Sequence, residues 1–373
     1  MSTTSAALTD ADGVRARVDG HIADHLSQLR AELAGIGADA APLADAVEQM
    51  LSGGKRLRAA FCYWSWRAHG GVPGTAAEVS VLRVGAALEL FQAAALFHDD
   101  VMDDSDTRRG FPAAHRSFAD RHRRSGLEGD ARHFGQSAAI LLGDLALVAS
   151  EREFAESLAG IPEPAARRAR GVFDLMRTEV TVGQYLDVLG QSLPWGDDTV
   201  ADEARAREVI RAKSARYSVE HPVVLGAALA GASDAELATC RSLGLPLGEA
   251  FQLRDDLLGV FGDPASTGKP AGDDLREGKR TVLVARTVAR AQEDGDARTL
   301  DLLRRTLGDR HASAEAITTL ARAVRASGAV EDLEVLIASL SAEAFAVIDA
   351  QDWLDPARSM LVALAHAAVD RAA

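Results

Sequence analysis

Helical spacing of apolar residues along almost the whole chain is the feature that most limits how this sequence can fold. From Val14 onward, apolar residues recur every three or four positions, which places them on one face of an α-helix. Alanine and leucine dominate, and only 11 of the 373 residues are proline. We find no run with the alternating pattern of a strand. The sequence therefore predicts an all-α protein.

The predicted helices follow one another without an interdomain linker or a short-period repeat. A length of 373 residues would ordinarily suggest two or three domains. We nevertheless expect one helical domain over residues 13–373, after a disordered tail over residues 1–12. The charged, glycine-bearing segment 119–135 is expected to be an exposed loop or a loosely held excursion, without an assigned function. The expected helices cover residues 14–34, 41–52, 57–69, 75–102, 136–158, 164–189, 202–219, 222–230 and 234–260, with a final group after a polar loop that ends near 280.

Charge and composition exclude several kinds of partner. The formal net charge of −14 repels nucleic acid and anionic lipid, so neither is expected as a major partner. No stretch of 18 apolar residues occurs, so no membrane span is expected, and the first residues do not resemble a signal peptide. The two cysteines, Cys62 and Cys240, match neither a disulfide framework nor a zinc site. We expect a cytoplasmic protein.

The stretch "FHDDVMDDSDTRRG", residues 97–110, ends a long predicted helix and holds five aspartates within eight positions. Asp99 and Asp103 are four residues apart and share a helix face. Mg²⁺ commonly bridges one or two carboxylates to substrate phosphates. Aspartate near a helix C-terminus is disfavoured by the helix dipole, and a bound metal would offset that cost. A solvated acidic helix end remains the alternative for this motif alone.

A second aspartate pair, Asp255 and Asp256, ends another apolar helix in "FQLRDDLLGVFGDPASTGKPAGDD". A polar loop again follows. The recurrence predicts that the two helices face each other across one cavity.

Basic residues accompany both acidic motifs. Arginine and lysine side chains suit phosphate oxygens, and an acidic protein needs such local cations to attract a diphosphate. Each of these residues alone would be read as a solvated surface charge. They are Lys55, Arg56 and Arg58 in "GGKRLR", Arg108 and Arg109 after the first motif, Lys213 in "AKSARYS", and Lys269 and Lys279 in the polar loop.

Six motifs together resemble those of the trans-isoprenyl diphosphate synthases, also called polyprenyl synthetases. They are "GGKRLR", "HDDVMDDSDTRRG", "VGQYLDVL", "KSARYS", "FQLRDDLLGVFGDPASTGK" and "DLREGKRT", in the family's order. The resemblance covers about residues 40 to 290. It implies a single bundle of helices around a deep central cavity, usually as a homodimer. It also implies a Mg²⁺-dependent enzyme that condenses isopentenyl diphosphate with allylic diphosphates to a linear all-trans prenyl diphosphate.

The resemblance implies a role for each residue that matches a family motif. The residues implied to bind metal, with about three Mg²⁺ ions per active site, are Asp99, Asp103 and Asp255. The residues implied to bind isopentenyl diphosphate are Lys55, Arg58, Gln92 and Arg109. The residues implied to contact the allylic diphosphate are Arg108, Lys213, Ser214, Gln252 and Lys269, with Lys279 on a closing loop. Gln184 and Asp187, on the cavity wall, are expected to orient Lys213.

The implied reaction is ionisation, then condensation, then proton loss. Mg²⁺ and the side chains of Arg108, Lys213 and Lys269 would stabilise the departing diphosphate as its charge grows. The released diphosphate would serve as the base. The catalytic residues are therefore expected to be Asp99, Asp103, Arg108, Lys213, Asp255 and Lys269.

Two departures from the family pattern bear on the site. The second motif usually reads Asp-Asp-x-x-Asp, but Gly259 stands at its last position here. One water-mediated metal contact is expected to be lost, so that the third metal binds more weakly. The final "DRAA" lacks the basic tail of some family members, and closure would use other groups.

Product length is expected to depend on residues N-terminal to Asp99, because the growing chain should run along the helix that carries it. Ala95, Ala94 and Phe91 would line that wall. In the family, aromatic residues at the first two positions stop growth at fifteen carbons. Phe91 lies about one turn deeper, roughly 5 Å, so we expect twenty-carbon geranylgeranyl diphosphate. The alternatives for the product are a farnesyl or a longer-chain diphosphate. The alternative for Phe91 is that it only packs against a neighbouring helix.

Two rival functions also follow from the sequence. A class I terpene cyclase ionises a prenyl diphosphate with magnesium and aspartates but needs no second diphosphate pocket, for which "GGKRLR" and Arg109 argue. A noncatalytic regulatory subunit of a heteromeric synthase tends to lose the aspartates, whereas this chain keeps the first motif whole.

Overall fold

The structure, a computed structural model, describes residues 11–263 and 271–370. The chain divides into two compact units, each assembled from separate stretches of sequence. Unit 1 comprises Met1–Val172, Pro222–Ala238 and Asp352–Leu364, and unit 2 comprises Phe173–His221, Thr239–Gln351 and Ala365–Ala373. The expectation of one domain over residues 13–373 stays a prediction. The expected tail lies outside the described residues except for Ala11 and Asp12, which begin a 3₁₀ turn, η1 (Ala11–Gly13).

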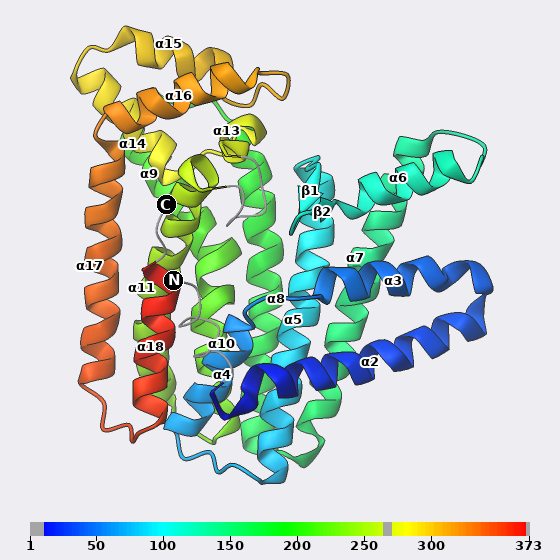
Figure 1. The fold of residues 1–373 in the computed structure, drawn as a ribbon. Coiled ribbons are helices and arrows are strands. Elements are labelled where there is room, and N and C mark those ends of the chain that lie inside the picture. The colour runs from blue at the N-terminus through cyan, green and yellow to red at the C-terminus, as the bar shows by residue number, and fades with distance from the viewer. Residues whose placement is uncertain (1–10, 264–270, 371–373) are drawn as a thin grey trace. The chain divides into compact units, whose positions relative to one another are not determined.

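Unit 1 is built around the long helix α5 (Ala76–Met102), which contacts α2, α4 and α7 (Figure 1). The side chain of Thr75 accepts a hydrogen bond from the backbone of Glu78 and so caps the start of α5. The helix is apolar on nearly all sides and is therefore buried. The other elements of unit 1 are α2 (Val14–Ile36), η2 (Ala38–Ala40), α3 (Ala41–Leu51), α4 (Leu57–Ala68), β1 (Thr107–Arg108), β2 (Phe111–Pro112), α6 (Ala114–Arg124), α7 (Ala131–Ser157), η3 (Leu158–Gly160) and most of α10 (His221–Leu229).

By length and composition alone, α5 would be able to cross a membrane. Of its most apolar window, 72% is buried inside the structure. Core helices pass the same test, so α5 is weak evidence for a membrane span.

The expectation that residues 119–135 form an exposed loop is wrong. Helix α6 continues to Arg124, α7 begins at Ala131, and the two helices pack against each other. Phe118 and His122 lie four residues apart on α6 and are both buried. They therefore form a stripe on one face of the helix that packs against its neighbour, although the sequence is highly charged. The high density of arginine concealed this stripe, and only residues 125–130 form the loop.

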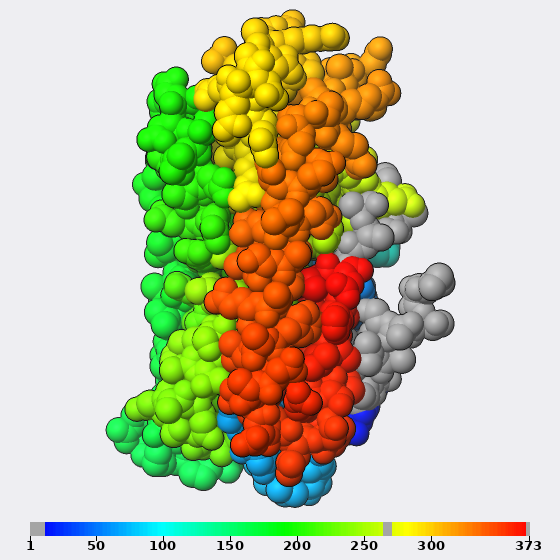
Figure 2. Space-filling model, turned by 90° about the vertical axis from the view of Figure 1, so that its left-hand side faces the viewer, coloured from blue at the N-terminus to red at the C-terminus, as the bar shows by residue number. Residues whose placement is uncertain are grey.

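Unit 2 is also helical. Helix α14 packs against α9 and α17, and Figure 2 shows α17 as a long surface helix of this unit. Arg254 on α11 donates to both carboxylate oxygens of Glu334 on α17, at 2.5 and 2.6 Å. The elements are α9 (Thr199–Val209), the π-helix η4 (Ile210–Glu220), α13 (Asp273–Glu277), α14 (Val282–Glu293), α15 (Ala297–Thr306), α16 (Ala314–Ala326) and α17 (Ala329–Asp349), with parts of α8 (Glu163–Ser192), α11 (Asp234–Phe261) and α18 (Ala357–Val369).

The prediction of an all-α fold is confirmed. Among the described residues the only strands are the two-residue β1 and β2, which form a hairpin. The expected helix over 202–219 is wrong in one respect, since it changes from α to π geometry at Ile210. The expected polar loop before residue 281 contains the short helix α13.

Candidate active site

The first aspartate motif lies at the C-terminal end of α5 in unit 1, as predicted. Asp103 caps the helix, and its backbone N–H donates to the carbonyl of Asp99 at 2.8 Å. Arg108 holds the motif in place. Its Nε and Nη2 donate to Oδ1 of the fully buried Asp100 at 2.8 and 2.5 Å, and its Nη2 lies 3.3 Å from Oδ2 of Asp99. The guanidinium predicted to contact the allylic diphosphate thus also fixes two carboxylates of the motif.

The hairpin of β1 and β2 positions both arginines that follow the motif. Thr107 pairs with Pro112 and Arg108 with Phe111. The turn between them is made by Arg109 and Gly110, with φ of 53° and 79°. Two successive positive φ values suit a tight hairpin turn, but they are uncommon for a residue with a side chain and recur at functional sites.

A cluster of guanidinium groups surrounds Arg109. Arg109 Nη1 donates to the carbonyl of Met50 at 2.6 Å. Burial lowers the pKa of Arg109. The carboxylate of Glu89 opposes this effect, and the positive charges of Arg56, Arg58 and Arg108 add to it. Cations held this close together favour the binding of an anion.

Arg56, which sequence reasoning grouped with the phosphate-binding cations, has a structural role. It is buried, and its guanidinium reaches Oδ1 of Asp19 at 2.8 Å and Oε2 of Glu89 at 3.0 Å. By contrast, Arg108 and Arg109 line a hollow in unit 1. Arg108 and Arg109 are therefore better placed than Arg56 to meet a ligand.

In unit 2, Lys213 and Ser214 lie on the π-helix η4. π-helical segments are rare and often mark functional sites. The Nζ of Lys213 donates to Oδ2 of Asp187 on α8 at 2.6 Å. This contact agrees with the expected pairing, and the role of Asp187 and Gln184 in orienting Lys213 stays a prediction. Gly183 permits the approach of the helices, because a Cβ at this position would lie 2.5 Å from the backbone nitrogen of Lys213.

The second aspartate motif occupies the last turns of α11 in unit 2. Asp256 is buried, and Gln252, predicted as a diphosphate contact, donates its amide to Oδ1 of Asp256 at 2.9 Å. Burial raises the pKa of Asp256 to about 7, and the negative charges of Asp274 and Asp255 add to that effect. That the two motifs face one cavity stays a prediction.

The polar loop before residue 281 carries two of the predicted lysines, Lys269 and Lys279. Lys269 lies outside the described residues. The Nζ of Lys279 lies 2.9 Å from Oε2 of Glu277 and 3.9 Å from Oδ1 of Asp274, so two carboxylates lie next to this lysine.

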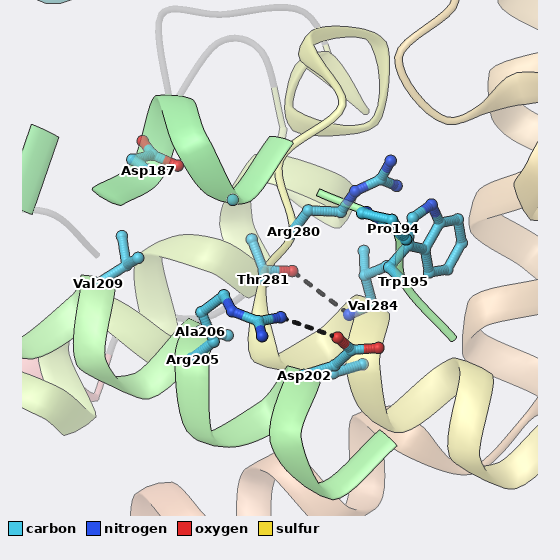
Figure 3. A pocket seen from close by; sticks show the side chains of 12 residues that line it. Asp187, Pro194, Trp195, Asp202, Arg205, Ala206, Val209, Arg280, Thr281 and Val284 are labelled. Atoms are coloured by element: carbon cyan, nitrogen blue, oxygen red, sulfur yellow. Dashed lines mark hydrogen bonds and ion pairs between the residues drawn. The ribbon is translucent and has the colours of Figure 1, made fainter. Parts of the chain in front are cut away.

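Sequence reasoning missed a hollow in unit 2 that includes Asp187 (Figure 3). Trp195 and Arg280 lie on one side of it, with the guanidinium 4.2 Å from the centre of the indole ring. Burial lowers the pKa of Arg280. Lys213 is not among the lining residues, so the hollow adjoins the Lys213 contact without including it.

The remaining predicted residues take positions consistent with the helix pattern. Phe91 and Ala94 are buried in α5, whereas Ala95 and Gln92 are partly exposed. Lys55 is exposed in the turn before α4, and Arg58, in the first turn of α4, is partly exposed.

The carboxylates fit a divalent ion bound together with a diphosphate. Within residues 11–263 and 271–370, no three His, Cys, Asp or Glu side chains form a metal cage by themselves. Mg²⁺ needs no such cage, because it keeps several waters and takes one or two carboxylates with substrate phosphates. Asp99 and Asp103, one turn apart at a helix end, offer such a donor set.

An all-α fold with aspartate pairs at helix ends and clustered guanidinium groups suits an enzyme that handles diphosphate esters. Residues 40–322 match the polyprenyl synthetase family. The chain therefore belongs to that family, and it is a trans-prenyltransferase that elongates prenyl chains.

Individual relatives agree with this assignment. The chain is 33% identical over 308 residues to a short chain isoprenyl diphosphate synthase of Methanothermobacter thermautotrophicus, covering 80% of this chain and 85% of that protein. It is 34% identical over 241 residues to a geranylfarnesyl diphosphate synthase of Aeropyrum pernix, covering 64% of this chain and 68% of that protein. A solved geranylgeranyl pyrophosphate synthase of Corynebacterium glutamicum, complexed with isoprenyl diphosphate and magnesium, matches with a TM-score of 0.89 and 39% identity over 96% of this chain and 98% of that one.

Proposed function

We propose that the protein condenses isopentenyl diphosphate with an allylic diphosphate, in the presence of Mg²⁺, to give linear all-trans geranylgeranyl diphosphate. The observation that carries the proposal is the guanidinium cluster around Arg109 beside the aspartates of α5. The aspartates suit a metal-bound diphosphate, and the guanidinium groups suit a second diphosphate. A terpene cyclase has no use for the second set.

Different residues of the chain serve different steps of the proposed reaction. Bound Mg²⁺ would neutralise charge on the allylic diphosphate. Lys213, held by Asp187, stabilises the negative charge that grows on the oxygen when the carbon–oxygen bond breaks and its electron pair leaves with the diphosphate. The double bond of isopentenyl diphosphate, oriented through Arg58 and Arg109, then attacks the allylic carbon. A proton leaves the new cation for the released diphosphate and completes the step. Asp99, Asp103 and Asp255 would hold about three Mg²⁺ ions.

One assay separates the candidate functions. The purified chain is incubated with Mg²⁺, isopentenyl diphosphate and an allylic diphosphate, and the products are identified by mass. A longer linear diphosphate is expected. A cyclic hydrocarbon would indicate a cyclase, and no product would indicate a noncatalytic subunit.

The twenty-carbon product rests on the buried Phe91 and the small residue at Ala94 on α5. Geranylgeranyl and geranylfarnesyl synthases both occur among the similar proteins, so the length needs its own test. Phe91→Ala should lengthen the product, and Ala95→Phe should shorten it to fifteen carbons or fewer. Phe345→Ala on α17 serves as a control for loss of a ring and should leave product length unchanged. An unchanged distribution in Phe91→Ala would show that the limit lies elsewhere.

We also propose a homodimer, on the basis of exposed apolar side chains spaced seven residues apart, as in helices that associate. On α7 these are Phe134, Leu141 and Val148, and on α8 they are Leu175, Val182 and Leu189. Leu141→Glu should convert a dimer to a monomer in light scattering coupled to size-exclusion chromatography. Val335→Glu is the control, because Val335 on α17 is also a well-exposed apolar residue and lies outside either stripe. A cytoplasmic location remains part of the proposal, and the two cysteines, buried and unbridged, are compatible with it.

A further inference from the structure

The hollow in unit 2 that includes Asp187 combines apolar walls with charged side chains (Figure 3). Its apolar walls come from the segment after α8, from α9 and from the start of α14, and they include Pro194, Val209 and Val284. Its charged side chains are Asp187, Asp202, Arg205 and Arg280. Apolar walls with a few polar groups are typical of small-molecule sites. The balance of the four charges decides which kind of molecule fits.

Three of these charged side chains already have partners. Oδ2 of Asp187 accepts a hydrogen bond from Nζ of Lys213 at 2.6 Å. Oδ1 of Asp202 accepts from Nη1 of Arg205 at 3.1 Å, and Oδ2 of Asp202 accepts from the backbone N–H of Gly196 at 2.7 Å. Each aspartate is thus paired with one basic side chain, so neither is left to neutralise the fourth charged group.

Arg280 is the charged group that remains. Among the residues that the structure describes, its Nε and Nη1 are buried and have no hydrogen-bond partner. Its guanidinium lies 4.2 Å from the centre of the Trp195 ring, which holds the group without supplying an oxygen acceptor. Burial lowers the pKa of Arg280, and the charge of Asp202 opposes this effect. Buried donors on a cation need an acceptor, and an acceptor with a negative charge binds them most strongly.

We propose that this hollow binds a small monoanion with an apolar body, such as an aromatic carboxylate. The carboxylate accepts hydrogen bonds from Arg280, and the apolar body contacts Val209 and Val284. One positive charge beyond the two ion pairs matches one negative charge. A diphosphate carries several negative charges and would be repelled by the carboxylates of Asp187 and Asp202, so the hollow differs in specificity from the substrate pockets.

Occupancy of the hollow should affect catalysis through Lys213, and this consequence rests on the proposed function. Asp187 belongs both to the hollow and to the pair that holds Lys213. A negative charge bound at this place opposes the negative charge that grows on the departing diphosphate. The ligand should therefore lower kcat without competing with isopentenyl diphosphate.

Binding of naphthoate to the full chain, measured by isothermal titration calorimetry without prenyl substrates, tests the site. Wild type should bind naphthoate at least about tenfold more tightly than the uncharged isostere naphthamide. Arg280→Gln should weaken naphthoate binding about 10- to 100-fold, because it removes the charge and the charge-assisted hydrogen bonds. Arg325→Gln is the matched control, since Arg325 also stacks on a ring in unit 2, 4.4 Å from the centre of Phe261, but does not line the hollow. Its affinity should stay within about twofold of wild type.

A second variant leaves Arg280 in place and narrows the hollow. Gly190 lines it, and a Cβ at this position meets nothing within 4 Å. Gly190→Leu should therefore weaken naphthoate binding while the melting temperature stays near that of wild type. This variant decides the question if Arg280→Gln does not fold.

Three results would overturn the site: no naphthoate binding by wild type, equal affinity in Arg280→Gln and wild type, or displacement of naphthoate by inorganic diphosphate with Mg²⁺. None of them would contradict the proposed function, because the binding assay contains no prenyl substrate. In turnover assays, naphthoate should lower the kcat of wild type and leave that of Arg280→Gln unchanged. Bound naphthoate with an unchanged kcat would overturn the link to Lys213 alone.

Discussion

At Gly183 the helix α8 lies against the backbone of the π-helix η4, and Gly183→Ala should slow catalysis more than it destabilises the fold. The added methyl carbon would lie 2.5 Å from the backbone nitrogen of Lys213 and 2.8 Å from its Cα, whereas ordinary contact begins at 3.4 Å. Both neighbours are backbone atoms, so no side chain can swing away. The two helices have to separate by about 1 Å.

That displacement acts directly on Lys213, the lysine that the proposed function places beside the departing diphosphate. Asp187, four residues along α8, holds Lys213 Nζ at 2.6 Å, so separating the helices also stretches this contact. A misplacement of about 1 Å can cost a factor of about 100 in rate. Overpacking costs about 1–3 kcal/mol, or about 2–6 °C in melting temperature at about 2 °C per kcal/mol. We expect kcat to fall about 10- to 100-fold, with little change in the KM for isopentenyl diphosphate.

Gly190→Ala provides the matched control on the same helix. A Cβ there meets nothing within 4 Å, so the variant should keep its kcat and gain up to about 1 kcal/mol in helix stability. Steady-state kinetics and thermal unfolding monitored by circular dichroism give both quantities. A Gly183→Ala enzyme with wild-type kcat and melting temperature would refute the close approach as a determinant of Lys213 position.

Three further predictions concern the metal motif, the two pockets and stability. Asp99→Ala should nearly abolish turnover without changing the circular dichroism spectrum, and a folded variant with near-normal turnover would contradict the metal role. Arg58→Ala should raise chiefly the KM for isopentenyl diphosphate, whereas Lys213→Ala should lower kcat; kinetics with the opposite pattern would mean that the pockets are exchanged. Glu78 has a pKa of about 2 instead of 4.5, mainly through the hydrogen bond from Arg17, so the stability it adds is present above about pH 4.5 and is lost as the pH falls through about 2. Over that window the unfolding free energy should fall by up to about 3 kcal/mol more in wild type than in Glu78→Gln, and parallel pH profiles would count against it.

The sequence could predict what depends on local spacing. The apolar period located α5, and the four-residue spacing of Asp99 and Asp103 placed both at its end. The pairing of Lys213 with Asp187 was anticipated through the family motifs. In each case the relevant information lies within a few turns of one helix or in a recurring motif.

What the sequence did not predict depends on contacts between distant segments. The hydrogen bond from Arg108 to Asp100 requires the hairpin turn at Arg109, and the residue types in this turn do not predict a positive φ at Arg109. The π geometry of η4 leaves no signature in the apolar spacing. Gly259 was visible as a departure, but the carboxylate of Asp274 that lies beside it comes from beyond a polar loop, so only the structure shows that the two residues are neighbours.

Helix α5 has a further consequence, because one uninterrupted helix of 27 residues carries Phe91 and ends at the aspartates that we propose to bind metal. Eight residues separate Phe91 from Asp99, about 12 Å along the axis. Under the proposed function, moving a bulky side chain up or down this helix would change product size in steps of about one turn while the chemistry at the far end stays untouched. Evolution can therefore retune what the enzyme makes by single substitutions, and a family of synthases with different products can share one catalytic apparatus.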